Sequence, residues 1–429
     1  MLPQIRSEEY LFSVPKFDVK KEDIESFDNE LRAFHANFAD CFSRSESRDH
    51  FYNYMVGQFS KLERKSIEPI ALAVENGRIR PLQHFISKVV WDDERILYKY
   101  RIMLNEDMGH PDGVLIFDET GYQKKGADSI GVAKQYCGTL GKVENCQIGV
   151  FAAYASPYGY ALLDKRLFIP KQWFSEDYAL RRKKCELPEN ITLKTKPQLA
   201  VEMLKEISGE AQIPFKWVLA DSIYGNSPEF IAAVEEYPHL CYFVSAPSDT
   251  LCWLHAPITR IKEYKYKGQL RKKMVLDSVE KNPITLASLA KSLSSYFWYR
   301  RKVSEGTKGP IEYEFTKRRI ILSKNGTPDR DVWLVIKRTI EDPPTYSYFL
   351  SNAPASTRLP TFVWLSGLRW PIEQCFEETK TELGMDHYEV RKYRGWHHHM
   401  LTCMLAHFFL WHLKIRLGKR STSYYALAA

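Results

Sequence analysis

The stretch that organises this chain reads VLIFDETG and covers residues 114–121. Its first four residues are apolar, and three of them are β-branched or aromatic, which predicts a buried strand. The strand delivers Asp118, and a glycine follows shortly afterwards. We therefore expect this carboxylate to emerge at the edge of a sheet, where binding sites usually form.

The same pattern returns in WVLADSIYG, residues 217–225. Again an apolar strand delivers an aspartate, Asp221, and a glycine follows. A single aspartate in this position usually serves a turn or caps a helix. Two of them in one chain indicate a shared metal site.

A third acidic candidate is Glu373, in the stretch RWPIEQCFEETK, residues 369–380. The apolar spacing predicts a helix that ends near Gly384. Glu373, Glu377 and Lys380 share one helix face, although an ordinary solvated stripe of charges has the same spacing. Two strand-end aspartates with a helical glutamate can hold two Mg²⁺ ions, because this metal prefers carboxylate oxygens. Such a pair of ions supports phosphoryl displacement.

The chain has 429 residues, with 61 basic against 53 acidic side chains and a net charge of +8. This length suffices for two or three domains, and the charge alone leaves nucleic-acid binding open. The eight cysteines include no Cys-x-x-Cys pair, which argues against zinc ribbons and fits a reducing cytosol. The most apolar segment, residues 400–413, is short for a membrane span and predicts a core helix. We therefore expect a cytoplasmic protein without a membrane segment.

The order of the elements predicts four parts. Residues 1–108 have apolar residues at helical spacing and predict a separate helical domain, for which DNA binding and a scaffold role are both open. Residues 109–245 and 361–415 predict an α/β core, a mixed sheet with flanking helices. A β-rich insertion, residues 246–360, interrupts this core, and residues 416–429 form a C-terminal tail.

Individual elements can be predicted within these parts. Strands are expected at 147–155 and 160–169, with Ser-Pro-Tyr-Gly as a hairpin turn between them. A helix is expected from Lys196, because Pro197 suits its first turn. The N-terminal part is expected to contain one long helix at 81–104.

The insertion is basic. Residues 260–273 contain seven cations against one glutamate, interleaved with tyrosines. A solvated loop is one interpretation of this run. The interleaved aromatic residues favour the other, contact with phosphates and stacked bases. The lysines that we assign to DNA binding are Lys265, Lys267, Lys272 and Lys273.

Four short motifs together resemble a known family. They are FDET (117–120), QYCGTLGK (135–142), ADSIYG (220–225) and RWPIE (369–373). They resemble the DDE transposases of bacterial insertion sequences, in the group with a β-rich insertion before the last acidic residue. The resemblance implies an RNase H-like catalytic core. It also implies that Asp118, Asp221 and Glu373 are catalytic and bind two Mg²⁺ ions, for which Mn²⁺ can substitute.

The resemblance also assigns DNA contacts. In this group the last motif reads Tyr-x2-Arg-x3-Glu-x6-Lys. Arg369, Glu373 and Lys380 match it, and Ser366 stands in place of the tyrosine. In the family, the tyrosine, arginine and lysine contact DNA next to the cleavage site.

Two further residues have a functional and a structural interpretation. Lys142 follows a glycine and either contacts phosphate or caps a turn. Trp298 resembles an insertion tryptophan that stacks on a flipped-out base, although a strand tryptophan more often packs in a core. Trp253 and Trp333 are rivals for the stacking role.

The family activity that these motifs imply is cut-and-paste transposition by DNA strand cleavage and strand transfer, often through a hairpin at the transposon end. The implied partners are double-stranded DNA, both the terminal inverted repeats and the target, with a homodimer in the active, nucleoid-associated complex. One alternative is a host nuclease of the same fold, such as a junction resolvase. Another is a domesticated DNA-binding protein without catalysis, although the presence of all three carboxylates argues against it.

Overall fold

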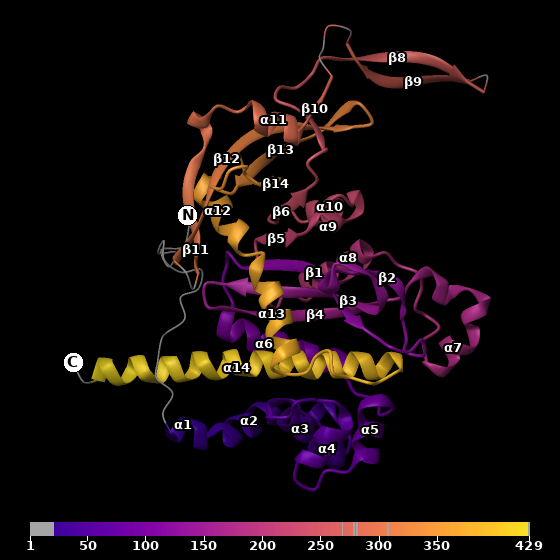
Figure 1. The fold of residues 1–429 in the computed structure, drawn as a ribbon, viewed down its shortest axis with the longest axis vertical. Coiled ribbons are helices and arrows are strands. Elements are labelled where there is room, and N and C mark those ends of the chain that lie inside the picture. Colours follow the sequence, from indigo (N-terminus) through magenta and orange to yellow (C-terminus); the bar gives the residue numbers. More distant parts are fainter. Residues whose placement is uncertain (1–20, 268, 278, 280–281, 307–308, 428–429) are drawn as a thin grey trace. The chain divides into compact units, whose positions relative to one another are not determined.

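The computed structural model describes residues 21–267, 269–277, 279, 282–306 and 309–427. The fold is mixed α/β, with β-sheet and flanking helices (Figure 1), which confirms the predicted class. The chain forms two compact units. We call Trp217–Arg369 the middle unit, and Phe12–Lys216 with Trp370–Ala429 the flanking unit.

The N-terminal part is helical, as expected. Its helices are α1 Lys21–Glu25, α2 Phe27–Ala36, α3 Ser45–Phe59, α4 Ile67–Ala73, α5 Ile79–Ser87 and α6 Asp93–Met108. The single helix expected at 81–104 is wrong, because the chain breaks after Ser87 and Asp92 caps α6 by accepting from the Arg95 amide at 3.1 Å. Helices α2, α3, α5 and α6 pack on the C-terminal helix α14, Tyr393–Leu427, within the flanking unit.

The flanking unit contains an antiparallel sheet. Its strands are β1 Val114–Gln123, β2 Ala133–Cys137, β3 Lys142–Ser156 and β4 Gly159–Phe168. β3 is central: β1 lies along one edge, and β2 and β4 share the other edge one after the other. The predicted hairpin turn is confirmed. Helices α7, Ala179–Lys184, and α8, Lys196–Glu210, follow, and α8 starts with a capping box on Thr195.

Strand β1 does not end at Asp118, so the expectation that this residue marks a strand end at the sheet edge is wrong. Asp118 is paired with Phe151 of β3, and the ladder continues to Gln123 opposite Cys146. The reason is the length of β3, which offers a partner to every residue of β1. Thr120 also remains buried, as a residue in mid-sheet should.

The middle unit starts with two parallel strands, β5 Trp217–Ala220 and β6 Cys241–Ala246. Helices α9, Ser222–Gly225, and α10, Pro228–Glu235, connect them. β6 continues into an antiparallel sheet that belongs to the insertion, so the predicted β-rich insertion extends this sheet. Its strands are β14 Tyr346–Ser351, β13 Thr327–Arg338, β12 Gly309–Lys324, β11 Tyr299–Gly306, β7 Leu251–Trp253 and β10 Ile284–Thr285.

The middle unit contains further helices and a separate ribbon. α11, Leu286–Ser292, follows β10, and α12, Leu359–Gly367, ends the unit. The basic run 260–273 forms a separate two-stranded antiparallel ribbon of β8, Thr259–Tyr266, and β9, Gln269–Leu276. In the described part of the chain, no helix is both long and apolar enough to span a membrane.

Candidate active site

The flanking unit places Asp118 beneath a helix. This helix, α13, runs from Trp370 to Thr381, and its Phe376 ring packs edge-on against Phe151 with the ring centroids 5.3 Å apart. Phe151 is the cross-strand partner of Asp118. Because cross-strand partners project to the same face of a sheet, Asp118 projects to the face that α13 covers.

A lysine fixes the same helix to β1. The Lys380 ammonium donates to Thr120 Oγ1 at 2.7 Å, to the Gly121 carbonyl at 3.1 Å and to Thr139 Oγ1 at 3.3 Å. Thr120 lies two residues beyond Asp118 and therefore shares its face. Burial lowers the pKa of Lys380, and the nearby Asp386 only partly offsets that effect.

Glu373 lies on the same side of α13 as Lys380. Seven residues are nearly two turns, so the two side chains leave the helix within about 20° of each other. Glu373 is exposed and lies in the first turn of α13. The structure therefore brings Asp118 and Glu373 to one face of one sheet, two of the three acidic residues predicted from sequence.

The opposite side of α13 is held by a network that the sequence analysis missed. The Glu378 carboxylate accepts from Tyr160 Oη at 2.9 Å, from Gln374 Nε2 at 3.0 Å and from His407 Nε2 at 2.7 Å. Burial raises the pKa of Glu378, but the hydrogen bond from His407 and the other donors outweigh it and lower the pKa. The signal in the sequence was a histidine within the apolar segment 400–413. This network fixes the rotation of α13 and with it the direction of Glu373.

Asp221 belongs to the middle unit, and here the predicted strand end is confirmed. β5 stops at Ala220, and the Asp221 side chain caps α9 by accepting from the Ile223 amide at 2.9 Å. β5 runs parallel to β6, so the carboxyl ends of both strands meet at one edge. Asp221 therefore stands where open α/β sheets usually bind ligands.

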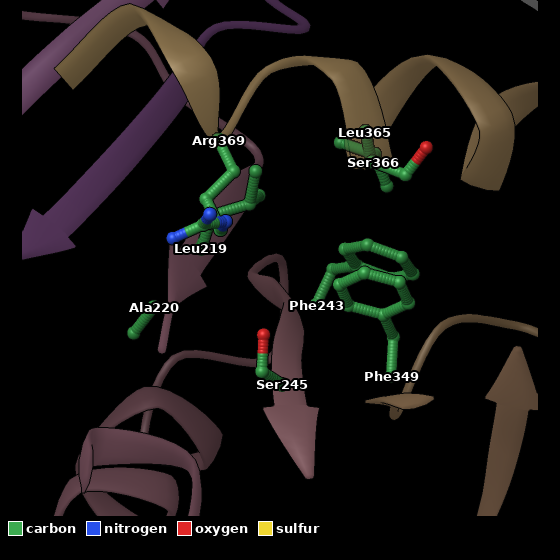
Figure 2. A pocket seen from close by; sticks show the side chains of 8 residues that line it. All are labelled: Leu219, Ala220, Phe243, Ser245, Phe349, Leu365, Ser366 and Arg369. Atoms are coloured by element: carbon green, nitrogen blue, oxygen red, sulfur yellow. The ribbon is translucent and has the colours of Figure 1, made fainter. Parts of the chain in front are cut away.

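A small hollow of about 190 Å³, counted with its open mouth, adjoins this edge (Figure 2). Arg369 and Ser366 line it together with the ends of β5 and β6. The Ser366 side chain is buried, and its hydroxyl donates to the Val363 carbonyl at 2.7 Å. At the position of the family's tyrosine the hydroxyl is thus used inside α12. The lining residues are Leu219, Ala220, Phe243, Ser245, Phe349, Leu365, Ser366 and Arg369.

The expected metal ligands are divided between the units. Asp118 and Glu373 belong to the flanking unit and Asp221 to the middle unit. Within the described residues of either unit alone, no group of three His, Cys, Asp or Glu side chains is arranged to hold a metal ion. The donor set nevertheless fits a hard divalent cation, because all three side chains are carboxylates and all are at least partly exposed.

The remaining lysines that the sequence predicts to contact DNA lie in other elements than the three carboxylates. Lys142 begins β3, is exposed and forms an ion pair with Glu144 at 3.3 Å. Its phosphate contact stays a prediction. The chain places Lys265, Lys272 and Lys273 in the β8–β9 ribbon and Lys267 at its tip, where it has a positive φ of 48°.

Trp298 has the environment of a packing residue. It is buried, and the Arg338 guanidinium lies over its ring at 4.0 Å from the centroid. Trp253 and Trp333 are buried as well, and the Lys317 ammonium covers the Trp333 ring at 4.0 Å. Base stacking by any of the three stays a prediction, and their burial favours packing.

Comparison with known proteins identifies the family of the chain. Residues 37–310 match the DDE superfamily endonuclease family, and this range includes Asp118 and Asp221 and ends before Glu373. The chain is also 26% identical over 363 residues to the "Probable transposase for insertion sequence element IS701" of Microchaete diplosiphon. The match covers 83% of this chain and 80% of that protein. Enzymes of this superfamily use divalent metal ions. The family predicted from the motifs is confirmed: the chain belongs to the DDE superfamily endonucleases.

Proposed function

We propose that this endonuclease is the DNA transposase of an insertion sequence, which cleaves DNA strands at the ends of the element and transfers them to a target. The similarity to a probable IS701 transposase along most of both chains supports this proposal over a host nuclease or resolvase. The presence of three candidate carboxylates supports it over a domesticated protein without catalysis.

In this proposal Asp118, Asp221 and Glu373 hold two Mg²⁺ ions, with Mn²⁺ as a substitute. The observation that carries it is the packing of α13, whose Phe376 and Lys380 contacts turn Glu373 toward the face of β1 that presents Asp118. Ions bound by these carboxylates would activate the attacking oxygen and stabilise the leaving oxygen of an in-line displacement.

Two cations are proposed to contact the DNA beside the cut. Lys380 holds its ammonium next to Thr120, so its charge acts on a nearby phosphate even while its N–H groups bond within the protein. Arg369 lines the hollow together with Ala220, the residue before Asp221, and can offer a bidentate fork to a phosphate. Lys142 and Trp298 are retained as weaker candidates for DNA contact.

The proposed substrates are double-stranded DNA with terminal inverted repeats, and target DNA, bound by a homodimer. Residues 1–108 are proposed to help bind this DNA. The proposed division of labour assigns catalysis to 109–245 and 361–415 and DNA contact to the insertion 246–360. The C-terminal tail 416–429 continues α14 in its described part.

The test is cleavage of labelled duplexes taken from both flanks of the reading frame, resolved on a denaturing gel. We expect nicking at the repeat boundary in Mg²⁺ or Mn²⁺ and none in Ca²⁺, because Ca²⁺ binds oxygen ligands at longer distances and in looser geometry. Full cleavage in EDTA would refute the metal site. Binding without cleavage in every metal would favour the protein without catalysis.

A further inference from the structure

The β8–β9 ribbon has two different faces. Figure 1 shows the two strands extending away from the other strands of the middle unit. Every residue of β8 except Thr259 is exposed, and β9 is exposed as far as Met274. A two-stranded hairpin is barely stable by itself, so a ribbon that is exposed on both faces indicates a binding function and not a packing function.

The pairing register sorts the side chains between the faces. Lys262 lies opposite Lys273, and Tyr264 lies opposite Arg271. Since alternate residues of a strand point to opposite faces and cross-strand partners to the same one, both pairs share one face. We call it the cationic face; its residues are Arg260, Lys262, Tyr264, Tyr266, Gln269, Arg271, Lys273 and Val275.

The cationic face holds four positive side chains and, among its described positions, no carboxylate. Lys262 and Lys273 are direct cross-strand neighbours, a placement that destabilises a free hairpin. The Arg271 guanidinium lies over the Tyr266 ring at 4.9 Å from its centroid, which limits its motion. The like-charge pair indicates a face that receives a polyanion, because a bound anion removes the repulsion.

The other face has a different character. Ile261 lies opposite Met274, and Lys272 forms an ion pair with Glu263 at 3.3 Å. Lys265 is its other cation and lies opposite Leu270. This face has two positive charges against one negative, so it attracts a polyanion much less than the cationic face does. We call it the apolar face; its residues are Thr259, Ile261, Glu263, Lys265, Leu270, Lys272, Met274 and Leu276.

We infer that the β8–β9 ribbon binds duplex DNA through its cationic face, with its two strands lying along a groove and the four cations reaching the phosphates on either side. This inference rests on the proposed function, and it names the DNA-contacting surface within the insertion. A two-stranded ribbon fits the major groove, and eight-residue strands extend about 27 Å. The earlier grouping of Lys265, Lys267, Lys272 and Lys273 is thereby divided, because Lys265 and Lys272 lie on the apolar face.

The faces provide a matched pair of variants. Lys262→Gln/Lys273→Gln and Lys265→Gln/Lys272→Gln each remove two charges, one from each strand, and keep most of the aliphatic stem. Binding of a labelled linear duplex is measured against salt concentration in EDTA. The first variant should reduce the slope of log K against log salt by about 1.8, at about 0.9 for each lost phosphate contact. The second should leave the slope close to that of the wild type.

Unequal slopes in this direction support the inference, while equal slopes or a larger change in the second variant overturn it and assign the cationic face to another partner, such as an acidic protein. Circular dichroism checks that both variants fold. Cleavage by the wild type in Mg²⁺ is measured in parallel. A wild type that cleaves element ends while both variants bind alike refutes only the ribbon, whereas a wild type that neither binds nor cleaves refutes the proposed function.

Discussion

Strands β1 and β5 have nearly the same sequence pattern, and the chain uses them differently. In β1 the apolar run leads into Asp118 and the strand continues to Gln123, whereas β5 stops at Ala220 and Asp221 begins a helix. The neighbouring strand explains the difference. β3 is antiparallel and long enough to pair with all of β1, whereas the parallel pairing of β5 with β6 requires a crossover through α9 and α10. Backbone pairing holds Asp118 in place, and a cap holds Asp221.

The variants with the largest expected effect test whether Asp118 and Asp221, which are held so differently, serve one active site. Asp118→Asn and Asp221→Asn should each reduce nicking of an end duplex in Mg²⁺ by about a thousandfold or more, because losing a metal ligand removes several kcal/mol of transition-state stabilisation. DNA binding should persist in both, since removing negative charge does not weaken the attraction of phosphates. The measurement is single-turnover nicking at saturating protein. If Asp118→Asn retains activity, its mid-strand position is only structural.

The next comparison lies on α13, the helix that faces Asp118. Glu373→Gln should abolish nicking, while Glu377→Gln should leave most of it. Relative to Lys380, which marks the direction of β1, Glu373 is rotated by about 20° and Glu377 by about 60°. Both glutamates are exposed on one helix, so each variant is a control for the other.

The reverse result, with Glu377→Gln inactive and Glu373→Gln active, would show that the motif alignment is wrong. Glu378→Gln tests whether the rotation of α13, and not only the identity of the metal ligand, affects nicking. It would disturb the buried contacts with His407 and Tyr160 and thereby the rotation of α13. A partial loss of nicking with intact DNA binding is expected of it, since the metal ligands themselves remain.

Much of the fold could be predicted because local patterns and tertiary structure agree in it. The strands of the core, the hairpin turn before Gly159 and the start of α8 at Lys196 follow from apolar runs and turn residues. The end of β1 could not be predicted, because the length of a strand depends on its neighbour. The break before α6 depends on a cap at Asp92 within a continuous helical pattern.

The candidate site could also be predicted only in part. Asp118, Asp221 and Glu373 could be named from short motifs, whereas the network of Glu378, Tyr160 and His407 joins residues far apart in the chain. The two faces of the ribbon were hidden as well. Cations occur at both odd and even positions of 260–273, and only the register shows which of them Glu263 neutralises.

The smallest expected effect is a difference in the free energy of unfolding between variants of Asp221 and variants of Asp118. Asp221→Ala should lower the free energy of unfolding by about 1 kcal/mol relative to Asp221→Asn, because asparagine can still accept from the Ile223 amide and alanine cannot. Comparing alanine with asparagine cancels the removal of charge, which both variants share. At Asp118, which is partly exposed and caps no helix, the same comparison should give less than about 0.5 kcal/mol. There the carboxylate accepts from the adjacent Glu119 amide at 2.8 Å, and the pairing with β3 holds the strand independently of this bond. Urea denaturation in EDTA measures all four variants without any contribution from bound metal. Equal differences at the two positions would mean that the cap contributes nothing at Asp221, and that β1 and β5 hold their aspartates by the same means after all.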